Sequence, residues 1–383
     1  MPVTRLDIEK FLSLHFEYPV IDVRSEAEFA HAHIPGAVSM PLFNNEERKV
    51  VGTAYKQQSK QTAIKIGLGL FGKKMVDLVE AVEKILESGG DNSDKTVVVH
   101  CWRGGMRSGG VGWLLDLYGF KVYTIIGGYK AYRQWSLQQL AKDYSIKILG
   151  GFTGSGKSYV LQQLKKMNNV VIDLEGLANH KGSAFGNIGM PPQPSQEMFE
   201  NMLALELWKA DSKASGDDGA SEVESGQLTD DSPSLSTVNS QPSTTIWLED
   251  ESQRIGLVNI PANFFKIMRS KPVYFLDIPF EERLKHITSD YGKSGKQELV
   301  SAILRIQKRL GGLETKQAIN FIIEDNLTEG FRILLKYYDK LYYKGLHSRE
   351  KLDELLIKIP CETVDASKNA GNIIAPKNKP ENV

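Results

Sequence analysis

The sequence predicts an α/β protein of two domains, the second of which is built on a parallel sheet and ends in a helical part. Three observations support this prediction. The chain has 383 residues, which is too long for one ordinary hydrophobic core and sufficient for two. Strand and helix signals alternate along the first 140 residues, and a strand–helix–strand pattern starts again near Tyr144. Each part also contains a glycine-rich loop directly after a hydrophobic strand.

The first domain is expected to span residues 1–140. Its clearest strand is residues 96–100, because a run rich in valine leads directly into a glycine-rich loop. Ser25 precedes Glu26 and Glu28, which is typical of a capped helix start. We expect strands at residues 19–23, 96–100 and 121–126, and helices at residues 25–31, 73–87 and 109–118.

The second domain is expected to span residues 144–365. We expect strands at residues 145–150, 170–173, 245–248 and 272–278, a first helix at residues 157–166, and a mostly helical part at residues 280–358. Residues 211–243 interrupt this pattern with nine serines, seven acidic residues and few aliphatic ones. They cannot bury enough apolar surface to offset the entropy of ordering, so we expect a disordered insertion there. Residues 366–383 are expected to form a flexible tail.

Composition indicates a compartment and allows a nucleic-acid partner. The two cysteines, Cys101 and Cys361, lie far apart in the sequence, which favours a reducing compartment over a disulfide framework. The first residues lack a signal-peptide pattern and no apolar run could span a bilayer, so we expect a cytoplasmic protein without membrane insertion. Residues 211–243 carry a charge of −6, which leaves +6 on the other 350 residues. A mildly basic body is compatible with binding a nucleic acid.

The first site motif is a phosphate-binding loop at residues 151–158. Its sequence, GFTGSGKS, fits the pattern Gly-x-x-x-x-Gly-Lys-Ser/Thr in full and lies between a hydrophobic strand and a helix. Converging backbone N–H groups, the helix dipole and the Lys157 charge favour a phosphate or a diphosphate, and Ser158 could hold Mg²⁺. The residues expected to bind phosphate are Gly151, Gly154, Ser155, Gly156, Lys157 and Ser158. The pattern does not single out ATP.

Acidic residues after the strands of the second domain are candidates for metal binding or acid–base chemistry. These are Asp173, Glu249 and Glu251. The alternative is that they are ordinary strand-end acids that face solvent. His180, in the glycine-rich stretch after Asp173, is a candidate active-site residue. The sequence contains no cluster of cysteine and histidine, so no metal site is firmly assigned.

The second site motif is a cysteine loop at residues 101–108. Backbone N–H groups that curl around Cys101, together with Arg103 and Arg107, would favour the thiolate, which is the nucleophilic form. A buried structural cysteine is the alternative. The spacing Cys-x5-Arg suits a phosphatase whose thiolate attacks a phosphate monoester, and it equally suits a carrier of sulfur or selenium on Cys101. The loop alone does not separate these chemistries.

The residues around the cysteine loop resemble a rhodanese domain. Residues 21–29 (IDVRSEAEF) and 33–37 (HIPGA) resemble its start, and residues 127–133 (GGYKAYR) its last strand and helix. Ala32 departs from the glycine that many rhodaneses have there. A rhodanese-like domain followed by a phosphate loop resembles the tRNA 2-selenouridine synthase family, and so do residues 44–58, 173–186, 249–256 and 290–291. The resemblance implies a rhodanese-like domain followed by a P-loop NTPase-like parallel-sheet domain.

The resemblance also implies a function. It implies a tRNA-modifying transferase that converts wobble 2-thiouridine to 2-selenouridine through an S-geranyl intermediate. Its co-substrates would be geranyl diphosphate and selenophosphate, with no tightly bound cofactor. We hypothesise that the phosphate loop holds the diphosphate and the cysteine loop the selenium donor. Taken singly, the two loops leave open a rhodanese-fold phosphatase or a nucleotide-dependent kinase.

A basic helix is the candidate for contacting tRNA. Arg305, Lys308 and Arg309 are spaced i, i+3 and i+4, so we expect them on one helical face. Arg283, Lys285 and Lys316 could extend this face. A solvated helix face is the common alternative for any run of charges. The sequence does not indicate an oligomeric state.

Overall fold

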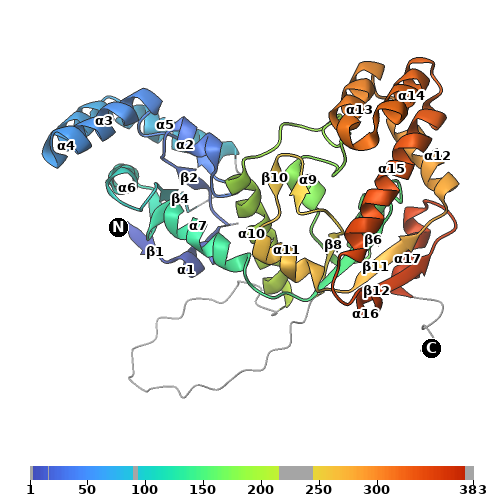
Figure 1. Cartoon of the computed structure of the whole chain (residues 1–383). Coiled ribbons are helices and arrows are strands. Elements are labelled where there is room, and N and C mark those ends of the chain that lie inside the picture. The colour runs from blue at the N-terminus through green and yellow to red at the C-terminus, as the bar shows by residue number, and fades with distance from the viewer. Residues whose placement is uncertain (1–2, 16, 89–93, 215–244, 376–383) are drawn as a thin grey trace, which may run out of the picture. The chain divides into compact units, whose positions relative to one another are not determined.

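The computed structural model describes residues 3–15, 17–88, 94–214 and 245–375, which form two compact units (Figure 1). The first unit comprises Met1–Gln139 with Glu200–Leu205, and the second comprises Leu140–Phe199 with Glu206–Val383. Each unit contains a five-stranded sheet whose neighbouring strands are all parallel, so the predicted α/β fold class is confirmed. None of the described helices is long and apolar enough to cross a membrane.

The sheet of the first unit has the strand order β1-β5-β4-β2-β3. Its strands are β1 (Thr4–Leu6), β2 (Val20–Asp22), β3 (Val38–Ser39), β4 (Thr96–His100) and β5 (Lys121–Ile125). The predicted strand β4 is central and buried at all five positions. Its carboxyl end therefore delivers Cys101 to the middle of one sheet edge.

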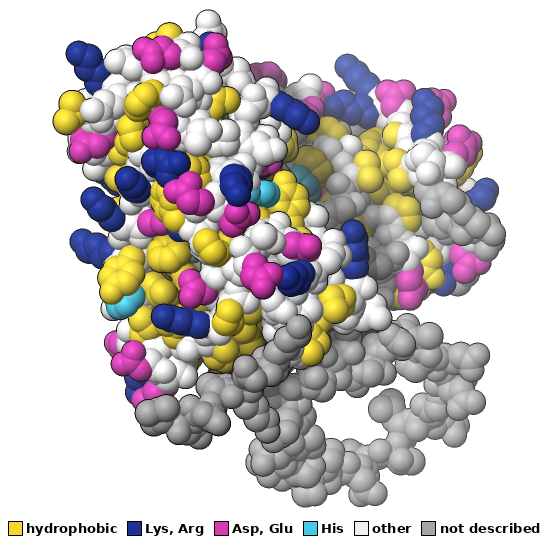
Figure 2. All heavy atoms as spheres, turned by 90° about the vertical axis from the view of Figure 1, so that its right-hand side faces the viewer, with side chains coloured by type: hydrophobic (Ala, Val, Ile, Leu, Met, Phe, Trp, Pro, Cys, Tyr) yellow, Lys and Arg dark blue, Asp and Glu magenta, His cyan; other side chains and the backbone are white. Residues whose placement is uncertain are grey.

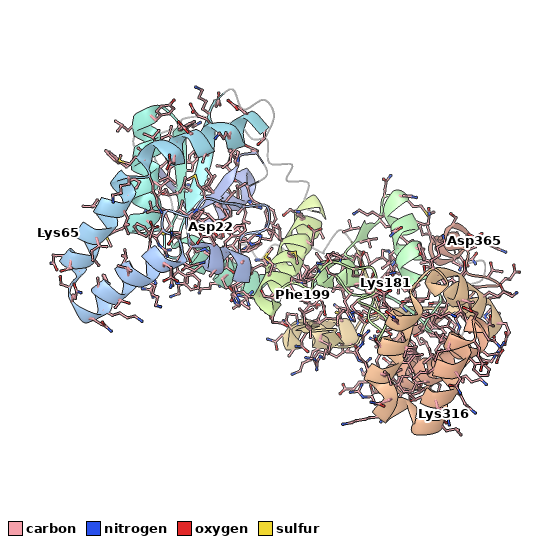
Figure 3. The ribbon with its side chains drawn as sticks, turned by 90° about the horizontal axis from the view of Figure 1, so that it is seen from above. Asp22, Lys65, Lys181, Phe199, Lys316 and Asp365 are labelled. Carbon is pink, nitrogen blue, oxygen red and sulfur yellow. The ribbon has the colours of Figure 1, made fainter. Side chains whose placement is uncertain are left out.

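Seven helices are described in the first unit. They are α1 (Ile8–Leu14), α2 (Glu26–His31), α3 (Asn45–Gln57), α4 (Lys60–Gly72), α5 (Met75–Ser88), α6 (Met106–Tyr118) and α7 (Gly128–Gln139). Ser25 begins α2 with a capping box, as the sequence predicts. Helices α3 and α4, which the sequence analysis did not predict, pair as a hairpin that projects from the sheet; Lys65 marks α4 in Figure 3.

The sheet of the second unit has the order β12-β11-β6-β8-β7. Its strands are β6 (Ile146–Gly151), β7 (Val170–Val171), β8 (Ile246–Glu249), β11 (Val273–Asp277) and β12 (Leu356–Pro360), and β9 (Arg254–Ile255) pairs with β10 (Val258–Asn259) beside it. Residues 356–358 were expected in the helical part, which is wrong. Their short apolar run pairs in parallel with β11, a contact made across some 80 residues of chain that no local signal reveals.

The helices of the second unit surround the sheet and extend beyond it. They are α8 (Lys157–Lys166), α9 (Leu174–Ala178), α10 (Gln196–Ala214), α11 (Ala262–Arg269), α12 (Phe280–Tyr291), α13 (Lys296–Leu310), α14 (Gly312–Ile323), α15 (Leu327–His347), α16 (Leu352–Leu355) and α17 (Ala366–Ile374). Residues Glu200–Leu205 of α10 belong to the first unit. Helices α12 to α15 pack on one another around a separate apolar cluster, and they form the expected helical part (Figure 1).

Two boundary predictions need correction. The expected flexible tail begins too early, because Asp365 caps α17 by accepting the Lys368 N–H at 3.0 Å, and Ala370 and Ile373 are buried against the sheet. The expected insertion also begins too early, because residues 211–214 are the last turn of α10. Residues 215–243 of that insertion and residues 376–383 of that tail lie outside the described part of the chain.

Candidate functional site

The phosphate loop joins β6 to α8 and depends on its glycines. Gly154 has φ +81° and Gly156, the N-cap of α8, has φ +70°, a region that side chains other than glycine rarely adopt. A Cβ at Gly154 would lie 2.8 Å from Ile287. The first N–H groups of α8 have no partner within the helix, and Lys157 Nζ folds back to donate to the Gly151 carbonyl at 3.1 Å. The loop therefore has the local geometry of an anion site.

One end of the phosphate loop is held by a buried polar chain that the sequence analysis missed. The Gly151 N–H donates to the Tyr342 hydroxyl at 3.1 Å, and that hydroxyl donates to Asp250 Oδ2 at 2.7 Å. Arg349 forms a buried ion pair with the other oxygen of Asp250. Burial and the Asp250 charge raise the pKa of Tyr342 well above its ordinary value, so the hydroxyl keeps its proton. Tyr342 is 191 residues from Gly151, and no local signal connects them.

The middle of the loop is held by Arg283. Its Nη1 donates to the Thr153 carbonyl at 3.0 Å, and both of its terminal nitrogens bind the Asp339 carboxylate, at 2.9 and 2.8 Å. Only 3% of Arg283 is exposed. The expectation that Arg283 extends a surface cation face is therefore wrong, because its guanidinium is buried and bound to Thr153 and Asp339.

Ser158 and two glutamates form the side of the loop that faces α9. Ser158 Oγ donates to Glu175 Oε2 at 3.1 Å, and Glu175 and Glu251 are hydrogen-bonded to each other. Burial and the Glu175 charge raise the pKa of Glu251 to about 8, against the attraction of Lys157. Burial also raises the pKa of Glu175. The pair therefore holds a proton at neutral pH, and a shared proton is what two adjacent carboxyl groups require.

The other two predicted acids have structural partners. Asp173 caps α9 by accepting the Gly176 N–H at 2.7 Å. Glu249 is 1% exposed, and its Oε2 accepts the Leu174 N–H at 3.0 Å while Oε1 has no partner among the described residues. Burial and the charge of Asp173 raise the pKa of Glu249 well above its ordinary value. No three His, Cys, Asp or Glu side chains in the described ranges are placed to hold a metal ion together.

These residues open into one cavity of about 1820 Å³, which we call the phosphate-loop cleft. Residues 153–158 line it together with Glu175, Glu251 and His180. The cleft also has apolar walls, which include Met190, Pro192, Leu257, Phe265, Leu341 and Leu346. Leu257 is 75% exposed, so its side chain is accessible from the cleft. The cleft thus combines an anion-binding loop with apolar surface.

The three predicted tRNA-binding cations are all exposed on α13 (Lys296–Leu310) and line two different hollows. Arg305 and Arg309 line the phosphate-loop cleft, whereas Lys308 lines a second hollow with Lys316. Arg305 Nη2 donates to the Ala184 carbonyl at 2.7 Å and to Asn187 Oδ1 at 2.9 Å, so it ties the stretch after His180 to α13. On the face shown in Figure 2, Lys and Arg side chains are interspersed with Asp and Glu.

In the first unit, the cysteine loop presents a thiol with a lowered pKa. Cys101 is 3% exposed and its Sγ lies 3.2 Å from Ser108 Oγ. Burial by itself would raise the pKa of Cys101, but hydrogen bonds from the Ser108 hydroxyl and from backbone N–H groups of Ser108, Arg103 and Gly105 outweigh it and lower the pKa. The loop therefore favours the thiolate, as the motif predicts.

The cysteine loop rests on the backbone at the start of α7. The Tyr129 N–H donates to the Cys101 carbonyl at 2.9 Å, and the Lys130 N–H to the Trp102 carbonyl at 3.0 Å. Gly128 has φ +57°, and a Cβ there would lie 2.2 Å from the Cys101 carbonyl oxygen. Beneath the loop, the buried Arg24 guanidinium stacks 3.9 Å from the Tyr129 ring and binds the Asp22 carboxylate.

The two predicted arginines of the cysteine loop, Arg103 and Arg107, differ in whether a carboxylate already binds them. Arg107 Nη1 donates to Glu28 Oε2 at 2.9 Å, and Arg48 approaches the same oxygen at 3.0 Å. Arg103 is exposed and forms no ion pair with any described residue. An anion at this loop would therefore find Arg103 available and Arg107 already paired.

The chain is similar to known proteins along most of its length. Residues 144–228 and 232–357 match the family described as tRNA 2-selenouridine synthase AAA domain, and residues 8–134 match the rhodanese-like domain. The tRNA 2-selenouridine synthase of Pseudomonas syringae pv. syringae is 32% identical over 372 residues, which cover 88% of this chain and 91% of that protein. The synthases of Sulfurovum sp. and Marinobacter nauticus are 33% and 32% identical; the matches cover 85% and 93% of this chain, and 87% and 95% of those proteins.

Proposed function

Because the chain belongs to the tRNA 2-selenouridine synthase family, we propose that it converts 2-thiouridine in tRNA to 2-selenouridine. We further propose that the conversion passes through an S-geranyl-2-thiouridine, made from geranyl diphosphate and then consumed with selenophosphate. The observation that carries this proposal is the phosphate-loop cleft, where an anion-binding loop and apolar walls face one cavity. A prenyl diphosphate is the class of substrate that needs both.

In the first step, the phosphate loop holds the diphosphate. The thiouridine sulfur attacks the first carbon of the geranyl chain, the bond from that carbon to oxygen breaks, and its electron pair leaves with the diphosphate. The growing negative charge is stabilised by the N–H groups at the start of α8 and by Lys157, which then releases the Gly151 carbonyl. Leu257 and the other apolar side chains cover the geranyl chain.

In the second step, the cysteine loop serves the selenium donor. Selenophosphate is an anion, and the exposed Arg103 with the loop N–H groups can bind it beside Cys101. The selenium of selenophosphate bonds to C2 of the base, and the carbon–sulfur bond at C2 breaks so that the S-geranyl group leaves as geranyl thiol. Water cleaves the phosphorus–selenium bond and releases phosphate, which leaves 2-selenouridine. Arg107 positions the loop through Glu28.

The described residues contain no group of three His, Cys, Asp or Glu side chains that could hold a metal ion, so a Mg²⁺ ion here would be held by Ser158 Oγ and by the diphosphate itself. Ser158 Oγ donates to Glu175 Oε2, and the Glu175–Glu251 pair holds a proton at neutral pH. We treat the neutral carboxyl of the Glu175–Glu251 pair as the feature that lets a diphosphate approach these acids.

The two single variants Lys157→Ala and Cys101→Ala test the assignment of steps. With a tRNA carrying 2-thiouridine, Lys157→Ala should lose S-geranylation, and Cys101→Ala should accumulate the S-geranyl nucleoside without forming 2-selenouridine. Mass analysis of the tRNA nucleosides measures both products. If Lys157→Ala geranylated normally but did not selenate, the assignment would be reversed. If the unaltered chain formed neither nucleoside, the proposed function itself would be wrong.

The apolar wall has its own test. Leu257→Ser should weaken the binding of geranyl diphosphate and leave inorganic pyrophosphate binding unchanged, because it adds no charge and only geranyl diphosphate presents a chain to Leu257. Calorimetric titration with both ligands measures the ratio. Equal weakening of both would assign the defect to the loop and remove Leu257 from the proposed prenyl site.

A tRNA surface along α13 is also proposed. Arg309 is exposed and lines the cleft, and Lys308 is exposed and lines the second hollow, so both could contact phosphates. Lys308→Ser with Arg309→Ser should weaken tRNA binding and flatten its dependence on salt. Unchanged binding would remove α13 from the interface. Arg305→Ser is less informative, because it also releases Ala184 and Asn187.

A further inference from the structure

Alkylation of a 2-thiouracil ring at sulfur leaves one proton to be removed. The ring enters with a hydrogen on N3, and the S-alkyl product has none there. Once the new carbon–sulfur bond forms, the ring is positively charged until the N3–H bond gives its electron pair back to the ring. The phosphate-loop cleft therefore needs a proton acceptor that faces the base.

Most titratable groups that line the cleft are unsuited to this role. Glu175 and Glu251 bind each other, and burial together with the Glu175 charge raises the pKa of Glu251 to about 8. Asp173 accepts the Gly176 N–H at 2.7 Å as the cap of α9. His286 lies edge-on to Tyr159, with ring centres 5.7 Å apart. His180 remains.

The ring of His180 is enclosed by glycines and has no hydrogen-bond partner. A Cβ on Gly186 would lie 2.7 Å from its Cε1 and its Nδ1, and a Cβ on Gly256 would lie 2.7 Å from its Cδ2. Nε2 is the ring atom between those two contacts. Nδ1 is buried without a partner, and no described residue is hydrogen-bonded to Nε2. The residue is 8% exposed and lines the cleft, so its polar edge is left for a ligand.

The charges around His180 favour a neutral imidazole. Burial and the nearby Arg305 guanidinium of α13 lower its pKa below the ordinary 6.5. The carboxyl groups of Glu175 and Glu251, which share a proton, lie beside Gly182, two residues after His180. A Cβ on Gly182 would be 2.7 Å from Glu251 and 2.9 Å from Glu175. A weak base is sufficient, because the alkylated ring is a cation and a strong acid.

We propose that His180 accepts the N3–H hydrogen bond of the thiouracil ring through Nε2 and takes that proton as the geranyl carbon is transferred to sulfur. The inference deepens the proposed function and rests on it. The electron pair of the broken carbon–oxygen bond leaves with the diphosphate, and the N3 proton moves to the imidazole. His180 thereby acts on the base, while Lys157 acts on the diphosphate.

The test compares His180→Asn with the control His347→Asn, an exposed histidine of α15 that does not line the cleft. S-Geranylation of a 2-thiouridine tRNA by the full chain is followed at saturating geranyl diphosphate. We expect His180→Asn to lower kcat about 100-fold or more, with KM for geranyl diphosphate changed less than about threefold. The acid limb of the wild-type pH–rate profile should disappear. Imidazole added to His180→Ala should restore part of the rate, which a purely structural role would not allow. His347→Asn should keep both the rate and the profile.

Two outcomes would overturn the proposal. The first is a His180→Asn enzyme that keeps its rate and its acid limb. The second is a His180→Ala enzyme that is folded by circular dichroism and binds pyrophosphate normally but gains nothing from imidazole. Either leaves the proposed function intact as long as the unaltered chain forms S-geranyl-2-thiouridine. Failure of the unaltered chain to alkylate the tRNA would instead remove the proposed function.

Discussion

Arg107 donates to Glu28 Oε2 at 2.9 Å, and Glu28 in turn accepts the Ser25 N–H at 3.1 Å. One carboxylate thus joins the end of the cysteine loop to the capping box of α2. The motif around Glu28 and the motif around Cys101 lie more than 70 residues apart, yet they form one structural unit. Arg107 is therefore held by the fold before any anion arrives at the loop.

Replacing Glu28 with Gln should destabilise the first unit and loosen the cysteine loop. The expected loss in the free energy of unfolding is about 1–3 kcal/mol, because Arg107 is left without its charged partner. Urea unfolding measures the loss, and Arg48→Ala, with 53% of its side chain exposed, should cost less than about 1 kcal/mol.

The same ion pair predicts a pH dependence. Burial of Glu28 is outweighed by the hydrogen bond and charge of Arg107, which lower its pKa from 4.5 to about 2. A carboxylate with a lowered pKa stabilises the fold above its unfolded pKa, and that stability is lost as pH falls from 4.5 towards 2. Glu28→Gln should flatten this part of the stability curve. An unchanged curve would show that Glu28 does not titrate as the structure implies.

Gly128 and Gly105 offer a matched pair of substitutions at the cysteine loop. A Cβ at Gly128 would lie 2.2 Å from the Cys101 carbonyl and 2.5 Å from the Gly104 nitrogen, and φ is +57°. A Cβ at Gly105 would meet nothing within 4 Å, and φ is −103°. Gly128→Ala should therefore displace the loop and lower stability by more than about 2 kcal/mol, whereas Gly105→Ala should be tolerated.

Thermal unfolding measures the stability of the two glycine variants, and the rate of Cys101 labelling at different pH values reports the acidity of its thiol. Gly128→Ala should shift the pH dependence of labelling towards that of an ordinary thiol, because the loop N–H groups move away. If Gly105→Ala were as damaging as Gly128→Ala, backbone contact with α7 would not be what holds the loop.

The two cysteines should differ in acidity within one chain. Hydrogen bonds around Cys101 lower its pKa, whereas burial raises the pKa of Cys361 to about 11. Iodoacetamide should modify Cys101 at a lower pH than Cys361, as followed by peptide mass analysis. Ser108→Ala removes a hydroxyl 3.2 Å from Cys101 Sγ and should move the Cys101 profile upwards while leaving the Cys361 profile unchanged. Coincident profiles for Cys101 and Cys361 would contradict the thiolate assignment.

Much of the architecture was predictable because its signals are local. The loop at residues 151–158 stands between a strand and a helix in the sequence itself, and Ser25 with Glu28 gives the capping box within four residues. Helix α8 matches its predicted bounds for the same reason. Cys101 follows a valine-rich strand, so its place at the edge of the sheet follows from that strand being buried.

The supports of the phosphate loop were not predictable in the same way. Tyr342 and Arg283 reach the loop from 191 and 130 residues away, and both read as ordinary members of amphipathic helices. Glu175 is different, because it lies two residues after Asp173 within the stretch that resembles the family. Its place in the first turn of α9, opposite Ser158, was a signal that could have been used.

The shared proton of Glu175 and Glu251 predicts how anion binding changes with pH. Glu251 is neutral below its pKa of about 8, so a diphosphate meets less negative charge beside Lys157. As pH rises through 8, Glu251 ionises and pyrophosphate affinity should fall. Glu251→Gln keeps the site neutral, so its affinity should exceed that of the wild type above this pH and match it near pH 6. Titration calorimetry measures the pyrophosphate affinity of both proteins at each pH. The ionisation of pyrophosphate is the same for both proteins at a given pH, so it drops out of the ratio of their affinities. The exposed Glu354→Gln serves as the control for a general change in charge. A constant affinity ratio between Glu251→Gln and wild type across the whole range would mean that the pair does not hold a proton beside the loop.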